Sequence, residues 1–302
     1  MGLNRALVGK QYPAQDYGVT AEAVGKYARA YNEENPLFFE AGPSHSVLAP
    51  PMFGVVLGWL PIMTVVTDSE LKVDVLRLLH AEQDMRFVLP VVSGDIITST
   101  ATLLDIEDKA GGESFTLAVD STNQRGQIVQ HMRFGAFIRG ERRRGRSFGA
   151  FGPSPQAQPL LRVAQSIDPD QTYRYAEASG DRNPIHLDEN IARLAGLPGI
   201  IVHGLCTMAF TSKVMIDHLC DREPSRLKRL RVRFSRPVFP GQTITTAVWI
   251  QRGNVSSSGM SMVDTFPLYT EPTSRNSVYI YETYNPDGKA VVKDGIAEIA
   301  PA

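Results

Sequence analysis

The chain has 302 residues, of which 43% are hydrophobic and 21% are charged, and its formal net charge at pH 7 is −1. Such a length allows two modest domains or one domain built twice, and the composition is ordinary for a globular protein. Because positive charge is not in excess, we expect neither a nucleic acid nor an anionic membrane as a partner. The first residues lack a basic end followed by an apolar core, so we expect no secretory signal.

The chain contains two cysteines, Cys206 and Cys220. If both lie on one helix, their separation of 14 positions corresponds to roughly 21 Å, which a disulfide cannot bridge. Two unpaired thiols and the missing signal predict a reducing, cytoplasmic location. No Cys/His cluster in the sequence has zinc spacing, and no glycine-rich phosphate loop occurs, so we expect no metal site.

The first predicted element is a short amphipathic helix, because Val24, Tyr27, Ala28 and Tyr31 follow the i, i+3, i+4, i+7 spacing of one helix face. Four strand-like runs appear further along the first half, at 84–92, 95–107, 114–123 and 127–139. A helix followed by antiparallel strands is an α+β pattern.

Between the predicted helix and these strands, segment 47–66 carries no charge and is about as long as a membrane span. Prolines break its beginning, and Pro61 interrupts it again. The remaining apolar run, 52–60, is too short to cross a bilayer. We therefore interpret the segment as a buried core helix around 53–66, and not as a membrane anchor.

A linker is predicted at 141–159, where a basic stretch is followed by one rich in Gly and Pro. We interpret this basic stretch as a connector whose arginines are exposed to solvent. It separates a first unit, 1–140, from a second unit, 160–302.

The second unit repeats the order of the first. Thr172, Tyr175, Ala176 and Ser179 occupy the same helical spacing. Asp168 is expected to cap this helix, with Pro169 in the first turn and Gln171 completing a capping box, and Gly180 is expected to end it. A longer apolar helix follows around 204–219, and then come strand-like runs at 229–236, 242–251, 260–268, 277–284 and 289–299.

Three matches in the same order indicate an internal duplication. Tyr-Ala and Asn-Pro pairs in the first helix region recur 148 positions later, Arg86-Phe87 recurs as Arg233-Phe234, and Asn123 and Gly126 recur as Asn285 and Gly288.

The stretch between Tyr175 and Gly204 is dense in residues that could do chemistry. Asp181 and His186 flank a turn that follows a helix end and contains a proline, which predicts a fixed loop. A carboxylate and an imidazole on such a loop could act together on one water molecule as acid and base. Taken singly, Asp181 could be a turn residue or a cap, and His186 a structural histidine. Asp188 is expected to cap the following short helix.

The sequence SGDRNPIHLD, followed by AGLPGIIVHG, resembles the signature of the MaoC-like (R)-specific enoyl-CoA hydratases, also called type 2 hydratases. With the repeat, the resemblance extends over nearly the whole chain. It implies the hotdog fold, in which a curved antiparallel sheet wraps a long apolar helix. Two copies in one chain imply a double hotdog of class α+β.

The resemblance also implies roles for individual residues. Asp181 and His186 would be the catalytic pair, Asn183 would hold the loop or the water, and the N–H of Gly204 would face the thioester oxygen. A helix N-terminus suits a developing enolate oxygen, because its amides lack partners and carry partial positive charge. Further along the motif, we expect Gly199, Ile200 and His203 to contact substrate, although His203 could instead pack or hydrogen-bond at the helix start.

The first unit departs from this motif, since Glu33 and Phe38 stand where the second has Asp181 and His186, and Phe53 replaces His203. A phenylalanine cannot exchange a proton, so we expect one active site per chain. Phe38 and Phe53 would line the acyl pocket, or would simply pack in the core.

The implied reaction is reversible syn addition of water to a trans-2-enoyl-CoA, giving an (R)-3-hydroxyacyl-CoA. Coenzyme A enters as part of the substrate, no other cofactor is expected, and two chains could pair into a homodimer. The arginines and lysine of 226–233 could meet coenzyme A phosphates or form a solvated strand face. A dehydratase of the same family, a hotdog thioesterase and a non-catalytic acyl-thioester-binding subunit are the alternatives.

Overall fold

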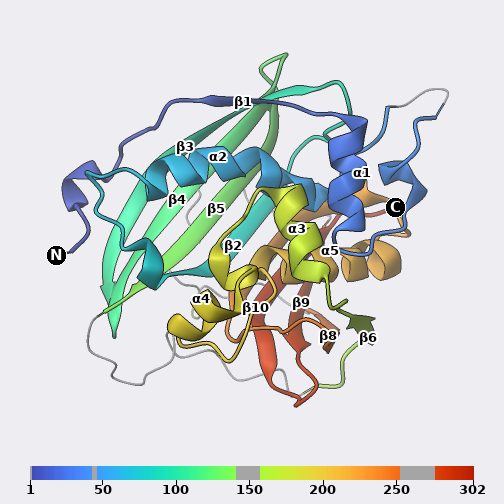
Figure 1. The fold of residues 1–302 in the computed structure, drawn as a ribbon. Helices are drawn as coiled ribbons and strands as arrows, with labels where there is room; N and C mark the ends of the chain where they lie inside the picture. Colours follow the sequence, from blue (N-terminus) through green and yellow to red (C-terminus); the bar gives the residue numbers. More distant parts are fainter. Residues whose placement is uncertain (1, 43–45, 141–156, 252–275) are drawn as a thin grey trace.

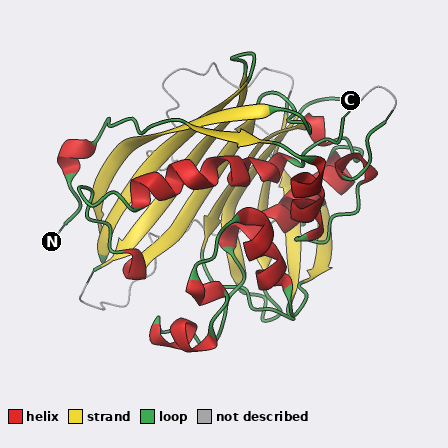
Figure 2. Cartoon of the chain, turned by 45° about the horizontal axis from the view of Figure 1, so that its top comes forward, coloured by secondary structure: helices red, strands yellow, loops and turns green. Residues whose placement is uncertain are grey.

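The computed structural model describes residues 2–42, 46–140, 157–251 and 276–302. Within these residues, ten strands form one antiparallel sheet in the order β1-β3-β4-β5-β2-β7-β10-β9-β8-β6. The sheet is curved, and the helices gather on one of its faces (Figures 1 and 2). The first five strands come from the first repeat and the last five from the second, so the chain is an α+β double hotdog, as predicted.

The elements of the first repeat are β1 (Gln15–Gly18), α1 (Ala21–Arg29), η2 (Pro36–Phe38), η3 (Pro51–Phe53), α2 (Gly54–Val66), β2 (Leu78–Phe87), β3 (Ile96–Lys109), β4 (Gly112–Asn123) and β5 (Ile128–Arg139). The second repeat contains β6 (Leu161–Ser166), α3 (Gln171–Ser179), η5 (Pro184–His186), α4 (Glu189–Leu194), α5 (Gly204–Leu219), β7 (Leu227–Phe234), β8 (Thr243–Ile250), β9 (Ser277–Tyr284) and β10 (Ala290–Ile299). The η elements are single turns of 3-10 helix, and three more lie at Arg5–Leu7, Val75–Arg77 and Pro224–Arg226.

Strands β2 and β7 join the two repeats into one sheet. They run antiparallel, and the paired positions extend from Glu82 opposite Arg233 to Arg86 opposite Arg229. On β7, Arg229 and Arg231 point to one face of the sheet, and Leu230 and Val232 point to the other. Leu230 and Val232 are fully buried and contribute to the core.

The two apolar helices, α2 and α5, lie where the sequence predicted them. Most side chains of α2 are buried, including Val55, Ile62 and Val65, which confirms the buried-helix interpretation. The predicted interruption at Pro61 is wrong, because α2 continues through it. The ring removes a hydrogen-bond donor, but tertiary packing of an apolar helix outweighs that loss. Among the described residues, no helix combines the length and apolar character needed to cross a membrane.

The predicted strands agree with the sheet in most places, with three differences. β2 starts six positions before the predicted run at 84 and ends at Phe87, and the edge strands β1 and β6 were not predicted. The predicted strand at 260–268 and most of the linker, 141–156, lie outside the described residues.

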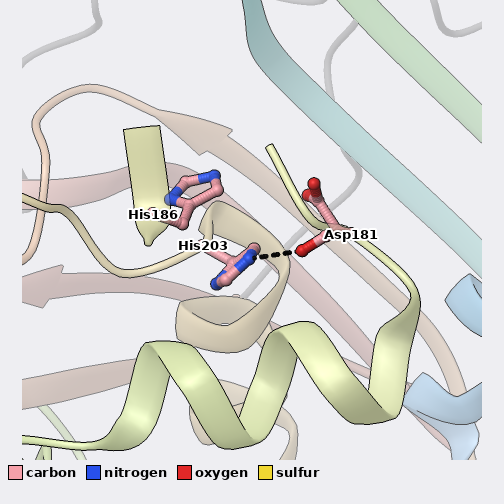
Figure 3. Close-up of side chains that lie close together, drawn as sticks. All are labelled: Asp181, His186 and His203. Atoms are coloured by element: carbon pink, nitrogen blue, oxygen red, sulfur yellow. Dashed lines mark hydrogen bonds between the residues drawn. The ribbon is translucent and has the colours of Figure 1, made fainter. Parts of the chain in front are cut away.

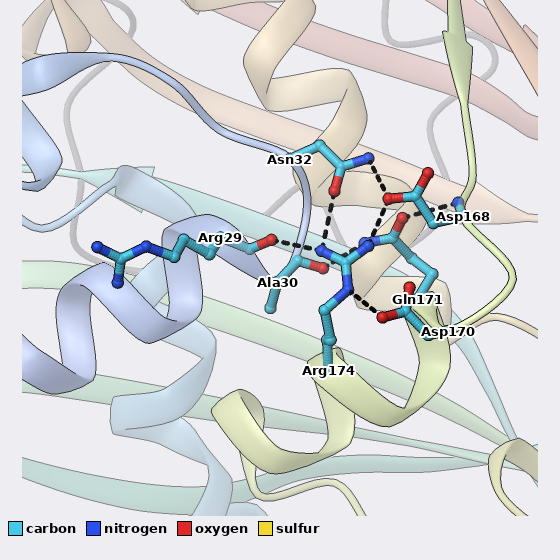
Figure 4. Close-up of polar contacts among 7 residues, drawn as sticks. All are labelled: Arg29, Ala30, Asn32, Asp168, Asp170, Gln171 and Arg174. Carbon is cyan, nitrogen blue, oxygen red and sulfur yellow. Dashed lines mark hydrogen bonds and ion pairs between the residues drawn. The ribbon is translucent and has the colours of Figure 1, made fainter.

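Helices α1 and α3 meet across the boundary of the repeats (Figure 4). Arg174 on α3 donates to the carbonyl of Arg29 at the end of α1 and to Oδ1 of Asn32, over 2.8 and 3.0 Å. A guanidinium suits the partial negative charge at a helix C-terminus. Gln171 also donates to the carbonyl of Ala30. These bonds fix α3, and with it the loop that follows, against the first repeat.

The predicted cap of α3 is partly wrong. The helix begins at Gln171 after Asp170, whose side chain makes no cap hydrogen bond. Gln171 does accept from the N–H of Asp168, at 3.0 Å, as a capping box requires. The carboxylate of Asp168 instead binds Arg174 of α3 itself and Asn32 of the first repeat. Gly180 ends the helix in the left-handed conformation, φ 81°, as predicted.

Candidate active site

The Gly180–His186 loop begins where α3 ends against the first repeat. A Cβ atom at Gly180 would lie 3.2 Å from Cδ1 of Trp59 on α2. Glycine therefore serves two needs, the positive φ and the close approach of an aromatic ring. The helix of the first repeat thus packs directly against the start of the loop.

Side-chain-to-backbone hydrogen bonds hold the loop in one shape. Oδ1 of Asp181 accepts from the N–H of Asn183 at 3.1 Å, and Oδ1 of Asn183 accepts from the N–H of Ile185 at 3.3 Å. These are the short bonds by which Asp and Asn stabilise turns. Asn183 begins the turn η5, which ends at His186. The contacts agree with the expectation that Asn183 holds the loop.

His186 is fixed by a hydrogen bond between its Nδ1 and the carbonyl of Ile201, at 2.8 Å. A carbonyl can only accept, so Nδ1 carries the proton, and Nε2 of the neutral ring keeps a free lone pair. The segment that provides this carbonyl leads into α5. It is joined to the loop again by the N–H of Ile201, which donates to the carbonyl of Ile185.

His203, the residue before α5, is buried and contacts both other site residues. Its Nε2 donates to the backbone carbonyl of Asp181 at 3.0 Å, and its ring stacks on that of His186. The ring of Tyr175 also packs near His203, with 5.0 Å between the ring centroids. These contacts agree with the packing and hydrogen-bonding alternative for His203.

Asp181, His186 and His203 thus come together, although 22 positions separate the first from the last (Figure 3). One carboxylate oxygen and one nitrogen from each ring all lie within 4.8 Å of one another. Burial raises the pKa of Asp181, and the neighbouring imidazole opposes part of this effect. Burial likewise lowers the pKa of His186, although the charge of Asp181 works in the other direction. The pair can therefore exchange protons nearer neutrality than an isolated carboxylate could.

The same three side chains have the donor types of a metal site, a carboxylate oxygen and two imidazole nitrogens. Each ring already uses one nitrogen on a backbone carbonyl, which is also how metal-bound histidines are oriented. The residues therefore permit either acid–base chemistry or a bound cation, and the absence of a metal remains a prediction.

Gly204 is the first residue of α5, so its N–H has no acceptor within the helix. No hydrogen bond to this N–H occurs in the part of the chain that the structure describes. A Cβ atom at Gly204 would lie 3.1 to 3.3 Å from the ring of Phe234 at the end of β7. The glycine thus leaves one amide unpaired beside an aromatic ring.

Two residues near this amide were not predicted for the site, Phe234 and His80. The ring of His80, on β2 of the first repeat, lies 5.1 Å from that of Phe234 and 4.3 Å from that of Phe134. Burial lowers the pKa of His80 to about 4. The duplicated Arg-Phe pair was the available signal for Phe234, whereas no local pattern marks His80.

The remaining predicted residues of the second repeat lie around the loop. Gly199 and Ile200 are half-buried in the segment before α5, and a Cβ atom at Gly199 would meet the carboxylate of Glu189 at 3.2 Å. Asp188 caps α4 by accepting from the N–H groups of Asn190 and Ile191, as predicted. Substrate contact by Gly199 and Ile200 remains a prediction.

In the first repeat, the corresponding carboxylate is neutralised by a lysine and not by an imidazole. Oε1 of Glu33 accepts from the N–H of Asn35 at 3.0 Å and from Lys213 of α5 at 3.2 Å. Phe38 is fully buried, which favours the core-packing alternative for this residue. Phe53 is buried against Tyr27 and Tyr17. Neither replacement can exchange a proton.

The arginines of β7 pair with carboxylates, so coenzyme A phosphates are not needed to explain them. Arg229 binds both oxygens of Asp84, over 2.9 and 2.6 Å, and also Glu298. Arg233 lies 2.8 Å from Glu82. The seam between the repeats is therefore an ion-pair network, formed by charges that are mostly buried.

Comparison with known proteins agrees with this architecture. The family model of the MaoC like domain matches residues 150–267, and that of the FAS1-like dehydratase domain region matches residues 6–132. A probable enoyl-CoA hydratase 2 of Dictyostelium discoideum is 28% identical over 95% of this chain and 92% of its own length.

Two further matches differ in how much of the other protein they cover. The peroxisomal multifunctional enzyme type 2 of Mus musculus is 28% identical over 78% of this chain, but the match spans only 35% of that enzyme. The crystal structure of a MaoC-like dehydratase from Phytophthora capsici superposes with a TM-score of 0.79 at 24% identity, covering 99% of this chain and 98% of the other. With a dehydratase-type family model on each repeat and relatives along almost its whole length, the chain belongs to the MaoC-like dehydratase family.

Proposed function

We propose that the protein adds water to a trans-2-enoyl-CoA and forms an (R)-3-hydroxyacyl-CoA, in a reversible reaction of fatty acid metabolism. The observation that carries the proposal is the meeting of the Asp181 carboxylate, the His186 imidazole and the His203 ring within 4.8 Å. The name of the Dictyostelium relative, a probable enoyl-CoA hydratase 2, supports it.

In this mechanism the thioester carbonyl accepts a hydrogen bond from the N–H of Gly204. That amide is unpaired among the described residues and lies at a helix N-terminus, where it favours negative charge on the oxygen. When electrons of the double bond move toward the carbonyl, the enolate oxygen gains charge at this point. Donors that are already in place stabilise the transition state more than the ground state.

The water lies between Asp181 and His186. Its O–H bond breaks as its oxygen bonds the β-carbon, and the acid–base pair takes the released proton. The pair then gives one proton to the α-carbon on the same face, which makes the addition syn. Nε2 of His186 can accept because Nδ1 holds the ring's proton against the carbonyl of Ile201. Asp181 can carry a proton because burial raises its pKa.

Dehydration of a 3-hydroxyacyl thioester uses the same atoms in reverse, and it is the second candidate function. The dehydratase-type family models that match the two repeats support this second candidate. The equilibrium and the supply of substrate decide the direction, whereas the site is the same.

A panel of trans-2-enoyl-CoA esters of increasing chain length tests the proposal. We expect loss of the conjugated absorbance, with the product assigned as the (R) isomer. Release of free coenzyme A thiol would instead identify a thioesterase, and binding with no turnover would identify an acyl-binding subunit. Either result would refute the hydratase assignment.

For the compartment we propose the cytoplasm, because Cys206 and Cys220 are buried and unpaired, as in reducing surroundings. The mouse relative is named a peroxisomal enzyme. The location of a fluorescent fusion in the native cell distinguishes the two compartments.

A further inference from the structure

The first repeat contains a pocket beside the start of α2. It is partly open to solvent and its walls are mostly apolar, with Leu48, Phe53, Gly54, Phe87, Val88 and Lys228 among the lining residues. Small-molecule sites usually have mostly apolar walls. Val88 leaves 45% of its surface exposed there.

The pocket occupies the position in the first repeat that the Gly204 region occupies in the second. The two repeats make matching backbone bonds around it. The N–H of Val88 donates to the carbonyl of Val129, and that of Ser235 donates to the carbonyl of Val291, both at 2.9 Å. Gly54 begins α2 as Gly204 begins α5.

A second pair of matching bonds fixes the segment that leads into each helix. The N–H of Ala49 donates to the carbonyl of Val91, and that of Val202 donates to the carbonyl of Val238, both at 2.8 Å. The aromatic residue at the end of the central strand corresponds as well, since Phe87 ends β2 and Phe234 ends β7. The pocket is thus the first repeat's version of the proposed acyl-thioester site.

The chemistry of that site is missing from the pocket. In the first repeat, the N–H of Gly54 already donates to the carbonyl of Pro51, because the turn η3 precedes α2. The corresponding N–H of Gly204 has no such partner among the described residues. Phe38 stands in place of His186, so the imidazole of the proposed acid–base pair has no counterpart at that position. The pocket therefore lacks the groups that the proposed reaction needs.

Lys228, on β7 of the second repeat, places a positive charge at the edge of the pocket. On β7 it lies on the opposite face from Arg229 and Arg231, which pair with carboxylates, and it lines the pocket instead. It forms no ion pair within the described ranges. The match of Arg86 with Arg233 puts Ala81 at the corresponding position of the first repeat's strand. A half-buried cation at the edge of an apolar pocket favours an amphipathic anion.

We propose that the first repeat holds a second, non-catalytic binding site for an acyl chain with an anionic head, with the chain against Phe53 and Phe87 and the head at Lys228. The head is either the carboxylate of a free fatty acid or the phosphates of an acyl-CoA. The site does not depend on turnover at Asp181 and His186.

Titration calorimetry with decanoyl-CoA, which is saturated and cannot add water, and with decanoate tests the proposal and distinguishes the two sources. If the site takes acyl-CoA, the unaltered protein binds two equivalents of decanoyl-CoA and Val88→Trp, which fills the pocket, binds one. If it takes fatty acids, decanoate binds the unaltered protein and not Val88→Trp. Binding of both compounds that is unchanged by Val88→Trp and by Lys228→Glu overturns the proposal.

Lys228→Glu should weaken this binding about tenfold or more, because it reverses the charge at the head group, whereas Lys228→Arg should retain it. Both variants and Val88→Trp should keep enoyl-CoA hydration within about twofold, since they lie outside the catalytic repeat's site. Ser235→Trp is the matched control, because it fills the corresponding position beside Gly204. It should abolish hydration and leave the first-repeat site intact. A protein that binds at the first repeat but never hydrates would refute the proposed activity and leave this site standing.

Discussion

His186 and His203 stack face to face, with ring centroids 3.8 Å apart and ring planes inclined by 28°. The contact joins the Gly180–His186 loop to the segment before α5, and His203 reinforces it by donating to the carbonyl of Asp181. Burial lowers the pKa of His203 well below its ordinary value, and the positive charge of a protonated His186 lowers it further. We therefore expect His203 to stay neutral and to position the acid–base pair.

Replacing His203 by Phe, the residue of the first repeat at this place, tests that role. The variant keeps an aromatic ring against His186 but loses the hydrogen bond to Asp181. We expect kcat/KM to fall roughly tenfold, the effect of about 1.4 kcal/mol, which is within the range of one hydrogen bond. Phe53→Ala in the first repeat is the control, since it should change stability much more than turnover. An unchanged kcat/KM in folded His203→Phe would remove His203 from the site.

Removal of either member of the acid–base pair should nearly abolish turnover. We expect Asp181→Asn and His186→Ala each to lower kcat by about 100-fold or more, the usual contribution of a positioned acid or base. Steady-state hydration of crotonyl-CoA or a longer ester measures this, and circular dichroism checks the fold. Treatment with a chelator should leave the activity of the unaltered protein intact. A loss restored by added zinc would show instead that the three side chains bind a required metal.

The pH dependence should follow from the lowered pKa of His186. Its lone pair on Nε2 is present above that pKa and disappears as the pH falls through it. We expect kcat/KM to stay level from pH 8 down to about 6.5, the ordinary pKa of histidine, and to decline only below it. Because the charge of Asp181 raises the pKa of His186, Asp181→Asn should move the titration of His186, followed by NMR, to lower pH. A shift to higher pH contradicts this account.

The buried hydroxyl pair of Tyr27 and Tyr175 lies between the two repeats, with 3.2 Å between the oxygens. Tyr27→Phe leaves the hydroxyl of Tyr175 buried without its partner, which should cost about 1 to 3 kcal/mol of unfolding free energy. The double variant with Tyr175→Phe should cost less than the sum of the two single changes, since no orphaned group remains. Denaturant unfolding of the four proteins measures the coupling. Strict additivity would mean that the bond contributes nothing.

The ion pair of Arg229 with Asp84 holds the seam between β2 and β7, and both residues are buried. Arg229→Met removes the cation that binds both oxygens of the buried Asp84 carboxylate, so we expect a loss of about 3 to 5 kcal/mol of stability. Lys228→Met, the adjacent position on the other face, is the control and should change stability by less than about 1 kcal/mol. Equal effects of the two substitutions in denaturant unfolding would refute the structural role of the pair.

Local patterns predicted a large part of the fold. The spacing of Val24 and Tyr27, the glycine that ends α3, and the start of α5 at Gly204 all follow from interactions between residues a few positions apart. Edge strands β1 and β6 are short, so their patterns carry little information. The prolines of the charge-free segment were misleading, because Pro61 lies inside a helix that its surroundings stabilise.

The sequence by itself determined the duplication, the α+β class and the loop that carries Asp181 and His186, because each rests on spacing along the chain. Only the tertiary structure decided which distant groups come together. His203 donates to the carbonyl of Asp181, and the ring of Phe234 lies beside Gly204 and contacts the ring of His80. Carboxylates lie opposite the arginines of β7. The carboxylate of Asp84 lies 145 positions from Arg229, and no local pattern encodes such a contact. The register of β2 against β7 and the curvature of the sheet bring such distant groups together.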